Sequence, residues 1–315
     1  MKIRQHLPDL VAAGLIFWSA ALGAAPFAYV PNEGSGTVSV IDTASDEVVA
    51  TIPAGKKPRG LAISGDWLYV SDQPNNRLQI IDLKMRVPAG TIALGESPEG
   101  VYASPDGRWI AAAIEESNDV AVTDTRTNKV AFTLKVKGRN PEHAVFSPDG
   151  QKLFVSAEEG EAVDIIDLAT REQVAQVAVG ARPRGIGFLP DGSLAYVAAE
   201  NSNEVYVIDT ATNKLVTHIK AGKRSNGISV HPDGSRVYVS NGGEASVSVV
   251  DTKDNHIIAT IGVGQRPWNM AITPDGKKLY VANGRSGSVS VIDTVHNVRL
   301  SDIAVGTLPW GVAIK

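Results

Sequence analysis

The sequence YVANGRSGSVSVID, from Tyr280 to Asp293, decides the fold because close copies of it recur along the chain. Counting this one, there are seven copies, and the other six end at Asp42, Asp82, Asp124, Asp167, Asp209 and Asp251. A second phrase, G-x-x-P-x-G or a near variant, alternates with the first and begins at glycines 40 to 43 residues apart: Gly55, Gly95, Gly138, Gly180, Gly222, Gly264 and Gly306. A period of this length, made of strand-forming residues, predicts one supersecondary unit repeated along the chain.

Within one unit, the residue pattern predicts four strands. In the unit from Gly264 to Gly306 they are Pro267–Thr273, Lys278–Asn283, Ser288–Asp293 and Arg299–Val305. A Pro-Asp-Gly turn follows the first of them. The repeat starts at a second strand, near Phe27, and ends at a first strand, residues 310–315. We therefore predict an all-β fold: a seven-bladed β-propeller of four-stranded antiparallel blades, closed where the C-terminal strand joins the N-terminal three strands.

The first residues have the pattern of a secretory signal peptide. Lys2 and Arg4 precede an apolar run of 13 residues, Leu10–Leu22, and small residues follow it. The sequence therefore predicts a signal peptide over residues 1–25, a single propeller domain over residues 26–315, and a periplasmic location. The run is too short to span a bilayer, so we expect no membrane span after signal removal. A permanent anchor remains the alternative.

Composition excludes several kinds of site. The chain has no cysteine, which rules out disulfides, thiolate metal sites and covalently attached c-type haem. Its formal net charge is −4, and a nucleic-acid partner is not expected because such partners require a concentrated basic surface.

The motifs YV-x-N, VSVID and Ser-Pro-Asp-Gly resemble the YVTN-type β-propeller repeat family across residues 27–315. The seven units, the leader and the opening phrase AYVPNEGSGTVSVID also resemble the β-propeller proteins associated with PQQ-dependent catabolism. That resemblance implies an exported protein that works beside a quinone-dependent alcohol-oxidising enzyme and its transport system. The repeats are similar as well to the d1-haem domain of nitrite reductase and to quinoprotein dehydrogenase subunits, so fold alone decides no chemistry.

The seven aspartates at the ends of the third strands look like a catalytic ring, but we interpret them as turn residues. Each precedes a threonine or leucine and a polar turn. An aspartate in this position can accept a hydrogen bond from a backbone amide two residues further on.

A second ring is predicted on the opposite face, at the mouth of the central channel. It is formed by the residue after each loop proline or its equivalent: Arg59, Glu99, Glu142, Arg184, Asn226, Trp268 and Trp310. The next position is glycine except at His143 and Asn269, which join the ring as candidate ligand-binding residues. Charged and aromatic residues at otherwise repetitive positions indicate a binding site, and a solvated rim of mixed charge is the alternative. We expect this set to suit an aromatic acid or a carboxylated quinone. We also expect alanine at Arg59 or Trp268 to change stability little.

Two classes of function remain open. The first is a noncatalytic binding or accessory protein, a monomer that engages a small molecule, a periplasmic quinoprotein or a transport component. No catalytic residue is assigned, since no nucleophile, base and orienting group can be recognised by spacing. The alternative is a lactonase-like hydrolase that uses a divalent metal, with Glu99 and Glu142 as candidate ligands. No cofactor is predicted, and PQQ or a metal stays open. A d1-haem would need His143 as its axial ligand.

Overall fold

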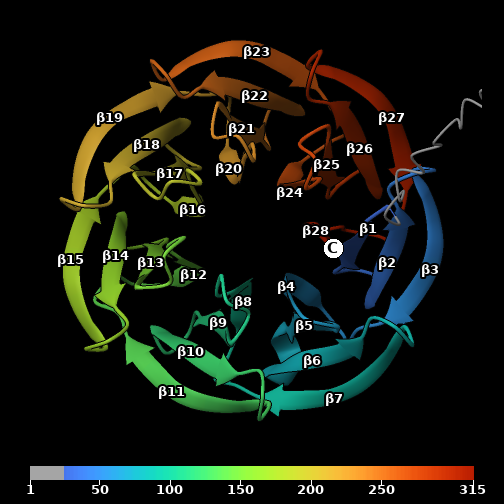
Figure 1. Ribbon diagram of the computed structural model, residues 1–315, viewed down its shortest axis with the longest axis horizontal. Coiled ribbons are helices and arrows are strands. Elements are labelled where there is room, and N and C mark those ends of the chain that lie inside the picture. The colour runs from blue at the N-terminus through green and yellow to red at the C-terminus, as the bar shows by residue number, and fades with distance from the viewer. Residues whose placement is uncertain (1–24) are drawn as a thin grey trace, which may run out of the picture.

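The structure, a computed structural model, describes residues 25–315, so the predicted signal peptide lies outside it except for Ala25. Seven four-stranded antiparallel sheets, the blades, surround a central axis, with the first strand of each blade innermost and the fourth outermost (Figure 1). The predicted seven-bladed β-propeller is confirmed. Within residues 25–315, no helix has the length and apolar character needed to cross a membrane.

Each blade consists of four strands that follow one another from the axis outward. Blade 1 has β28 (Ala313–Ile314), β1 (Phe27–Asn32), β2 (Thr37–Asp42) and β3 (Glu47–Pro53). Blade 2 has β4 (Pro58–Ser64), β5 (Trp67–Asp72), β6 (Arg77–Asp82) and β7 (Val87–Ala93), with the 3-10 helix η1 (Gln73–Asn75) between β5 and β6. Blade 3 has β8 (Pro98–Ala103), β9 (Trp109–Ile114), β10 (Asp119–Asp124) and β11 (Lys129–Lys135).

The other four blades follow the same order. Blade 4 has β12 (Pro141–Phe146), β13 (Lys152–Ala157), β14 (Ala162–Asp167) and β15 (Glu172–Ala178). Blade 5 has β16 (Pro183–Phe188), β17 (Leu194–Ala199), β18 (Glu204–Asp209) and β19 (Lys214–Lys220). Blade 6 has β20 (Ser225–Val230), β21 (Arg236–Asn241), β22 (Ser246–Asp251) and β23 (His256–Gly262). Blade 7 has β24 (Pro267–Ile272), β25 (Lys278–Asn283), β26 (Ser288–Asp293) and β27 (Val298–Ala304).

The core is distributed around the ring. Seven clusters of buried apolar side chains each combine residues from two neighbouring blades, for example Val40 of β2 with Val70 of β5. Second and third strands are buried on both faces, whereas the outermost strands are largely exposed and each buries one apolar residue, such as Ile52 or Ile303. Because every blade completes the core of its neighbours, the ring is one domain.

Ring closure occurs in blade 1, as the ends of the repeat predict. Ala313 and Ile314 of β28 pair with Tyr29 and Ala28 of β1. The regular strand is shorter than the predicted 310–315, because the chain leaves the ladder between Trp310, which donates to the Pro31 carbonyl, and Ala313. Other first strands show the same break in register after their loop proline, as between Pro267 and Met270. The ring residues lie within this break.

The third-strand aspartates act as the sequence predicts. Asp42, Asp82, Asp124, Asp167, Asp251 and Asp293 each accept a hydrogen bond from the amide two residues on, and Asp209 accepts one from the amide three residues on. These bonds hold the turns on the face opposite the predicted binding ring.

Candidate functional site

A pocket of about 380 Å³ lies at the channel mouth, on the face formed by the G-x-x-P loops and the loops that follow the second strands. It is lined by Glu33, Arg59, Gln73, Glu115, Glu142, Glu158, Arg182, Arg184, Asn226, Arg266, Trp268 and Trp310. We call it the mouth pocket. Nearly all of its wall is polar or charged, and two tryptophans supply its aromatic surface.

Six of the nine candidate residues from the sequence line this pocket: Arg59, Glu142, Arg184, Asn226, Trp268 and Trp310. The other three lie nearby but outside it. Glu99 is fully buried and contacts Arg59. His143 and Asn269 lie lower in the channel, against the side chain and backbone of Trp310. The ring is thus brought together, although not all of it faces the pocket.

Six lining residues are not among the nine candidates from the sequence: Glu33, Gln73, Glu115, Glu158, Arg182 and Arg266. The signal for them was present. Glu33 and Gln73 occupy the position after the second strand that Glu115 and Glu158 hold in other blades, and Arg182 and Arg266 precede the loop proline. A position-by-position comparison of these two loops across the blades identifies both sets.

Two glycines at the same loop position make room for side chains of the pocket. A Cβ on Gly242 would lie 2.9 Å from Nη1 of Arg266, and a Cβ on Gly284 would lie 2.7 Å from the ring of Trp268. Blades 6 and 7 therefore replace the loop acid by glycine where a large side chain of the pocket must fit.

Arg59 joins two carboxylates on one side of the mouth pocket. Its Nη1 lies 2.7 Å from Glu99, and its Nε lies 3.1 Å from Glu33. Glu33 and Glu99 are 8% and 0% exposed. Arg59→Ala would leave Glu33 with Lys57 as its cation and Glu99 without its guanidinium donor, so we expect a loss of stability instead of the small change expected from the sequence.

Arg184 occupies the corresponding place on the other side, where it meets three carboxylates. It contacts Glu142, and it lies 3.1 Å from both Glu158 and Glu200. Arg266 binds the second oxygen of Glu200 at 2.7 Å. The Arg184 guanidinium, itself mostly buried, holds the pKa of Glu142 and Glu200 below its usual range despite burial, which alone would raise it.

The ion pairs change the kind of ligand that we expect. Carboxylates around the pocket outnumber the guanidinium groups that line it, and each lining arginine is already engaged by a carboxylate of this chain. A carboxylated ligand would have to displace those partners. The structure therefore favours a neutral, hydroxylated ligand over the aromatic acid or carboxylated quinone expected from the sequence.

Glu115 and Asn226 are lining residues that are incompletely engaged, as is Nη1 of Arg266, a buried donor without a hydrogen-bond partner among residues 25–315. Among residues 25–315, no cation forms an ion pair with Glu115, whose Oε2 accepts one side-chain hydrogen bond, at 2.8 Å from Ser97. Within the same range, the side-chain amide of Asn226 has no hydrogen-bond partner, and this residue is 5% exposed. The mouth pocket thus offers a ligand the Glu115 carboxylate, the Asn226 amide and one guanidinium nitrogen of Arg266.

The floor of the mouth pocket is Trp310, which also lines a smaller cavity of about 90 Å³ below it. The ring of Trp310 stacks on His143, with centroids 5.7 Å apart and planes 18° apart. Nδ1 of His143 lies 2.5 Å from the hydroxyl group of Tyr102. Burial lowers the pKa of His143 to about 4, so the imidazole is neutral near pH 7. This stack separates the mouth pocket from the smaller cavity below it.

The cofactors left open by the sequence do not fit these residues. Among residues 25–315, no group of three or more histidine, aspartate or glutamate side chains is arranged to hold a metal ion. Glu99 and Glu142 are committed to Arg59 and Arg184. A d1-haem would need His143 free, yet this histidine is buried between Tyr102 and Trp310, and PQQ, a carboxylated quinone, would meet arginines that are already paired.

Glu99 shows how burial controls protonation at the site. Burial raises its pKa to about 8, and the Glu142 carboxylate adds to the rise, although contact with Arg59 opposes both. Desolvation prevails because the carboxyl group is completely removed from water.

The raised pKa of Glu99 predicts a pH dependence of stability. Since the unfolded value is 4.5 and the folded value about 8, the folded protein binds the extra proton between these limits. The contribution to the free energy of unfolding is complete below the lower limit and is lost as pH rises to the upper one. Glu99→Gln resembles the protonated acid, so we expect the variant to lose less stability than the wild type between about pH 5 and about pH 8. Urea unfolding at several pH values measures the free energy of unfolding of both proteins. If this free energy changed with pH to the same extent in both, the predicted role of Glu99 would be ruled out.

Comparisons with known proteins support the fold and suggest a relationship. The family model described as "Lactonase, 7-bladed beta-propeller" matches residues 166–300, which is less than half of the chain. A comparison with curated protein sequences finds no match.

Three solved structures illustrate the structural likeness. A protein of unknown function from Desulfotomaculum acetoxidans has a TM-score of 0.83 and 19% identity, over 92% of this chain and 99% of that one. Hydrazine synthase from Kuenenia stuttgartiensis has a TM-score of 0.79 and 21% identity, over 89% of this chain and 99% of that one. A putative 6-phosphogluconolactonase from Bacteroides uniformis has a TM-score of 0.77 and 20% identity, over 92% of this chain and 99% of that one. At these identities the likeness shows the fold alone.

Proposed function

We propose that the protein hydrolyses a small, neutral, hydroxylated lactone in the mouth pocket. The observation that carries this proposal is the pair Glu115 and Asn226 in the same polar pocket. Among residues 25–315, the Glu115 carboxylate has no cation partner and the Asn226 side-chain amide has no hydrogen-bond partner. The match of residues 166–300 to the lactonase propeller family supports this reaction class. So does the likeness to a putative 6-phosphogluconolactonase.

Each residue then has a defined role. Glu115 accepts a proton from water as the oxygen of that water attacks the lactone carbonyl carbon. The amide of Asn226 donates to the carbonyl oxygen as negative charge develops there. When the ring C–O bond breaks, the proton returns from Glu115 to the leaving alkoxide, and the product is a hydroxy acid. No metal takes part in this scheme.

The arginine and glutamate pairs select the substrate. Sugar hydroxyl groups can donate to the lining carboxylates and accept from the guanidinium groups without displacing an ion pair. A phosphorylated lactone would add negative charge to a pocket whose four lining arginines are already matched by four lining carboxylates, with Glu200 directly behind them. We therefore expect glucono-δ-lactone to be a better substrate than its 6-phosphate.

Glu115→Gln tests the proposal. General-base catalysis contributes about 10²- to 10⁴-fold, and we expect kcat for glucono-δ-lactone to fall by that factor, measured by acid release in a pH-stat. Stability should not fall, because Glu115 forms no ion pair within the described part of the chain and its charge raises the pKa values of Glu99 and Glu158. The adjacent Glu116→Gln is the control, since Glu116 is exposed and does not line the mouth pocket. Equal rates for the two variants would refute the role of Glu115.

A noncatalytic binding protein is the second candidate, and one observation favours it. The arginines of the mouth pocket are held by carboxylates on several blades, which gives a rigid, preformed cup. In this case the wild type binds the lactone or its hydroxy acid without accelerating ring opening. Calorimetric titration together with the pH-stat assay distinguishes the two candidates.

We also propose that the protein is exported to the periplasm. The leader pattern supports export to the periplasm, and the opening repeat supports an association with PQQ-dependent alcohol oxidation, with a quinoprotein or transport component as a partner of the monomer. Fractionation of cells that express the full chain tests export. A cytoplasmic product that retains residues 1–25 would argue against it.

A further inference from the structure

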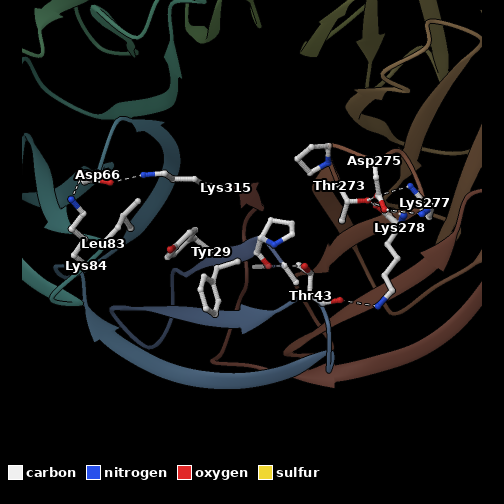
Figure 2. A pocket seen from close by; sticks show the side chains of 14 residues that line it. Tyr29, Thr43, Asp66, Leu83, Lys84, Thr273, Asp275, Lys277, Lys278 and Lys315 are labelled. Carbon is white, nitrogen blue, oxygen red and sulfur yellow. Dashed lines mark hydrogen bonds and ion pairs between the residues drawn. The ribbon is translucent and has the colours of Figure 1, made fainter. Parts of the chain in front are cut away.

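A second and larger pocket, of about 770 Å³, lies on the face opposite the mouth pocket. Its walls come from turns of blades 7 and 2 and from the start of β1 in blade 1 (Figure 2). Phe27, Leu83 and Pro274 contribute apolar surface, and lysine side chains surround it. This volume is in the range of small-molecule sites. We call it the turn-face pocket, and the proposed hydrolysis makes no use of it.

The turn-face pocket lies where a ring of stacked turns is interrupted. In blades 4 to 7 the glycine of the Pro-Asp-Gly turn packs against the proline of the preceding blade. A Cβ on Gly192 would lie 3.8 Å from Pro148, and one on Gly234 would lie 3.2 Å from Pro190. In blade 1 no such turn joins the first two strands, because β28 and β1 are far apart in the sequence. Pro274 of blade 7 therefore borders a pocket instead of the next turn.

The repeat is also broken at Tyr29. Two equivalent tyrosines donate their hydroxyl groups to an asparagine of the next blade: Tyr69 to Asn128 at 2.8 Å and Tyr196 to Asn255 at 2.7 Å. Opposite Tyr29, the asparagine position holds Arg86, whose guanidinium lies 5.0 Å from the centre of the Phe27 ring. Within residues 25–315 the Tyr29 hydroxyl has no acceptor, and this residue lines the turn-face pocket. Burial raises the pKa of Tyr29, so the hydroxyl group remains a neutral donor.

The charges around the turn-face pocket favour an anion. Lys84 and Lys315 both contact Asp66, at 2.6 and 2.8 Å, as Figure 2 shows for these three residues. Two ammonium groups thus share one side-chain carboxylate, and the lining side chains include four lysines against two aspartates. Lys277 stands on another side of the pocket, 3.4 Å from Asp275. This local excess contrasts with the net charge of −4 of the whole chain.

We propose that the turn-face pocket binds an amphipathic carboxylate, separately from the hydrolytic site. The apolar body of the ligand packs against Phe27, Leu83 and Pro274. Its carboxylate lies beside Lys84 and Lys315, because these two cations share one side-chain carboxylate, that of Asp66. The hydroxyl group of Tyr29 donates a hydrogen bond to the ligand, in place of the asparagine that other blades provide.

Calorimetric titration of the full chain with decanoate tests the proposal, with 1-decanol and decylammonium as probes that have the same apolar body. We expect saturable binding of decanoate, binding of decanol at least about tenfold weaker, and no binding of decylammonium. The double variant Lys84→Gln/Lys315→Gln should bind decanoate more weakly than the wild type by a similar factor. Lys253→Gln is the matched control, because Lys253 holds the place of Lys84 in blade 6 and is exposed. Its affinity should equal that of the wild type.

Two further variants introduce the residues that other blades carry, so they should fold. Leu83→Thr removes apolar surface, and Arg86→Asn gives the Tyr29 hydroxyl an internal acceptor. Each is expected to weaken decanoate binding several-fold. Arg86→Asn should keep the wild-type melting midpoint, whereas Leu83→Thr should lower it, because Leu83 is buried in the core between blades 1 and 2. Equal affinities for decanoate and decanol would overturn the proposal. So would wild-type affinity in all of these variants, or binding to phosphatidylglycerol vesicles without binding of free decanoate.

Discussion

Deletion of residues 310–315 is expected to abolish the monomeric folded protein. The deletion removes β28, which closes the ring by pairing with β1, and takes Trp310 and Val312, each 8% exposed, out of the core. Burial of a large apolar side chain is worth about 2 to 3 kcal/mol, against a total stability of about 5 to 15 kcal/mol. The unpaired edge of β1 would also be open to other chains. Light scattering after size exclusion should show loss of the monomer.

A single substitution on an outermost strand is the control for this deletion. Leu300 is 53% exposed on β27, and Leu300→Ser should leave both the monomer and the melting midpoint unchanged. A deletion protein that stays monomeric with the midpoint of the wild type would contradict ring closure through blade 1.

Arg184→Ala is expected to lower the free energy of unfolding by about 3 to 5 kcal/mol. The reason is that three carboxylates, Glu142, Glu158 and Glu200, would lose the guanidinium that they share in a site largely removed from water. Arg184→Lys keeps the charge but not the planar fork of donors, so its stability should fall between those of the wild type and Arg184→Ala. Urea unfolding near pH 7 measures the difference.

Arg139→Ala is the matched control for this measurement. Arg139 lies on the same face, 3.9 Å from Glu159, but the two side chains are 72% and 57% exposed. An exposed pair of this kind contributes about 1 kcal/mol or less. If the two alanine variants were equally stable, the ion pairs of the mouth pocket would not form a rigid framework.

The sequence predicts the fold well because each blade repeats the same local signals. Prolines, glycines and Asp-Gly turns bound the strands, so the predicted Lys278–Asn283 and Ser288–Asp293 match β25 and β26. The C-terminal strand is predicted too long, since the sequence shows no sign of the break in register that follows each loop proline. That break depends on hydrogen bonding between strands, which a pattern along one strand does not record.

The candidate site is predicted less completely. The ring position can be recognised because it departs from the repeat, and six of its residues line the mouth pocket. The contacts between blades cannot be recognised in this way. Arg184 of blade 5 reaches Glu142 of blade 4, and Trp310 of blade 1 stacks on His143 of blade 4. Such contacts depend on side-chain conformation and on the closed ring, so spacing along the sequence does not reveal them.

The most direct test of the central claim is the kcat for glucono-δ-lactone of Asn226→Ala relative to the wild type. We predict a fall of about 10²- to 10³-fold, the loss expected when one donor to a developing oxyanion is removed. Asn201→Ala, an exposed asparagine on the same face, should keep the wild-type rate. A wild type that opens the lactone no faster than buffer, or an Asn226→Ala variant that matches Asn201→Ala, would contradict hydrolysis in the mouth pocket.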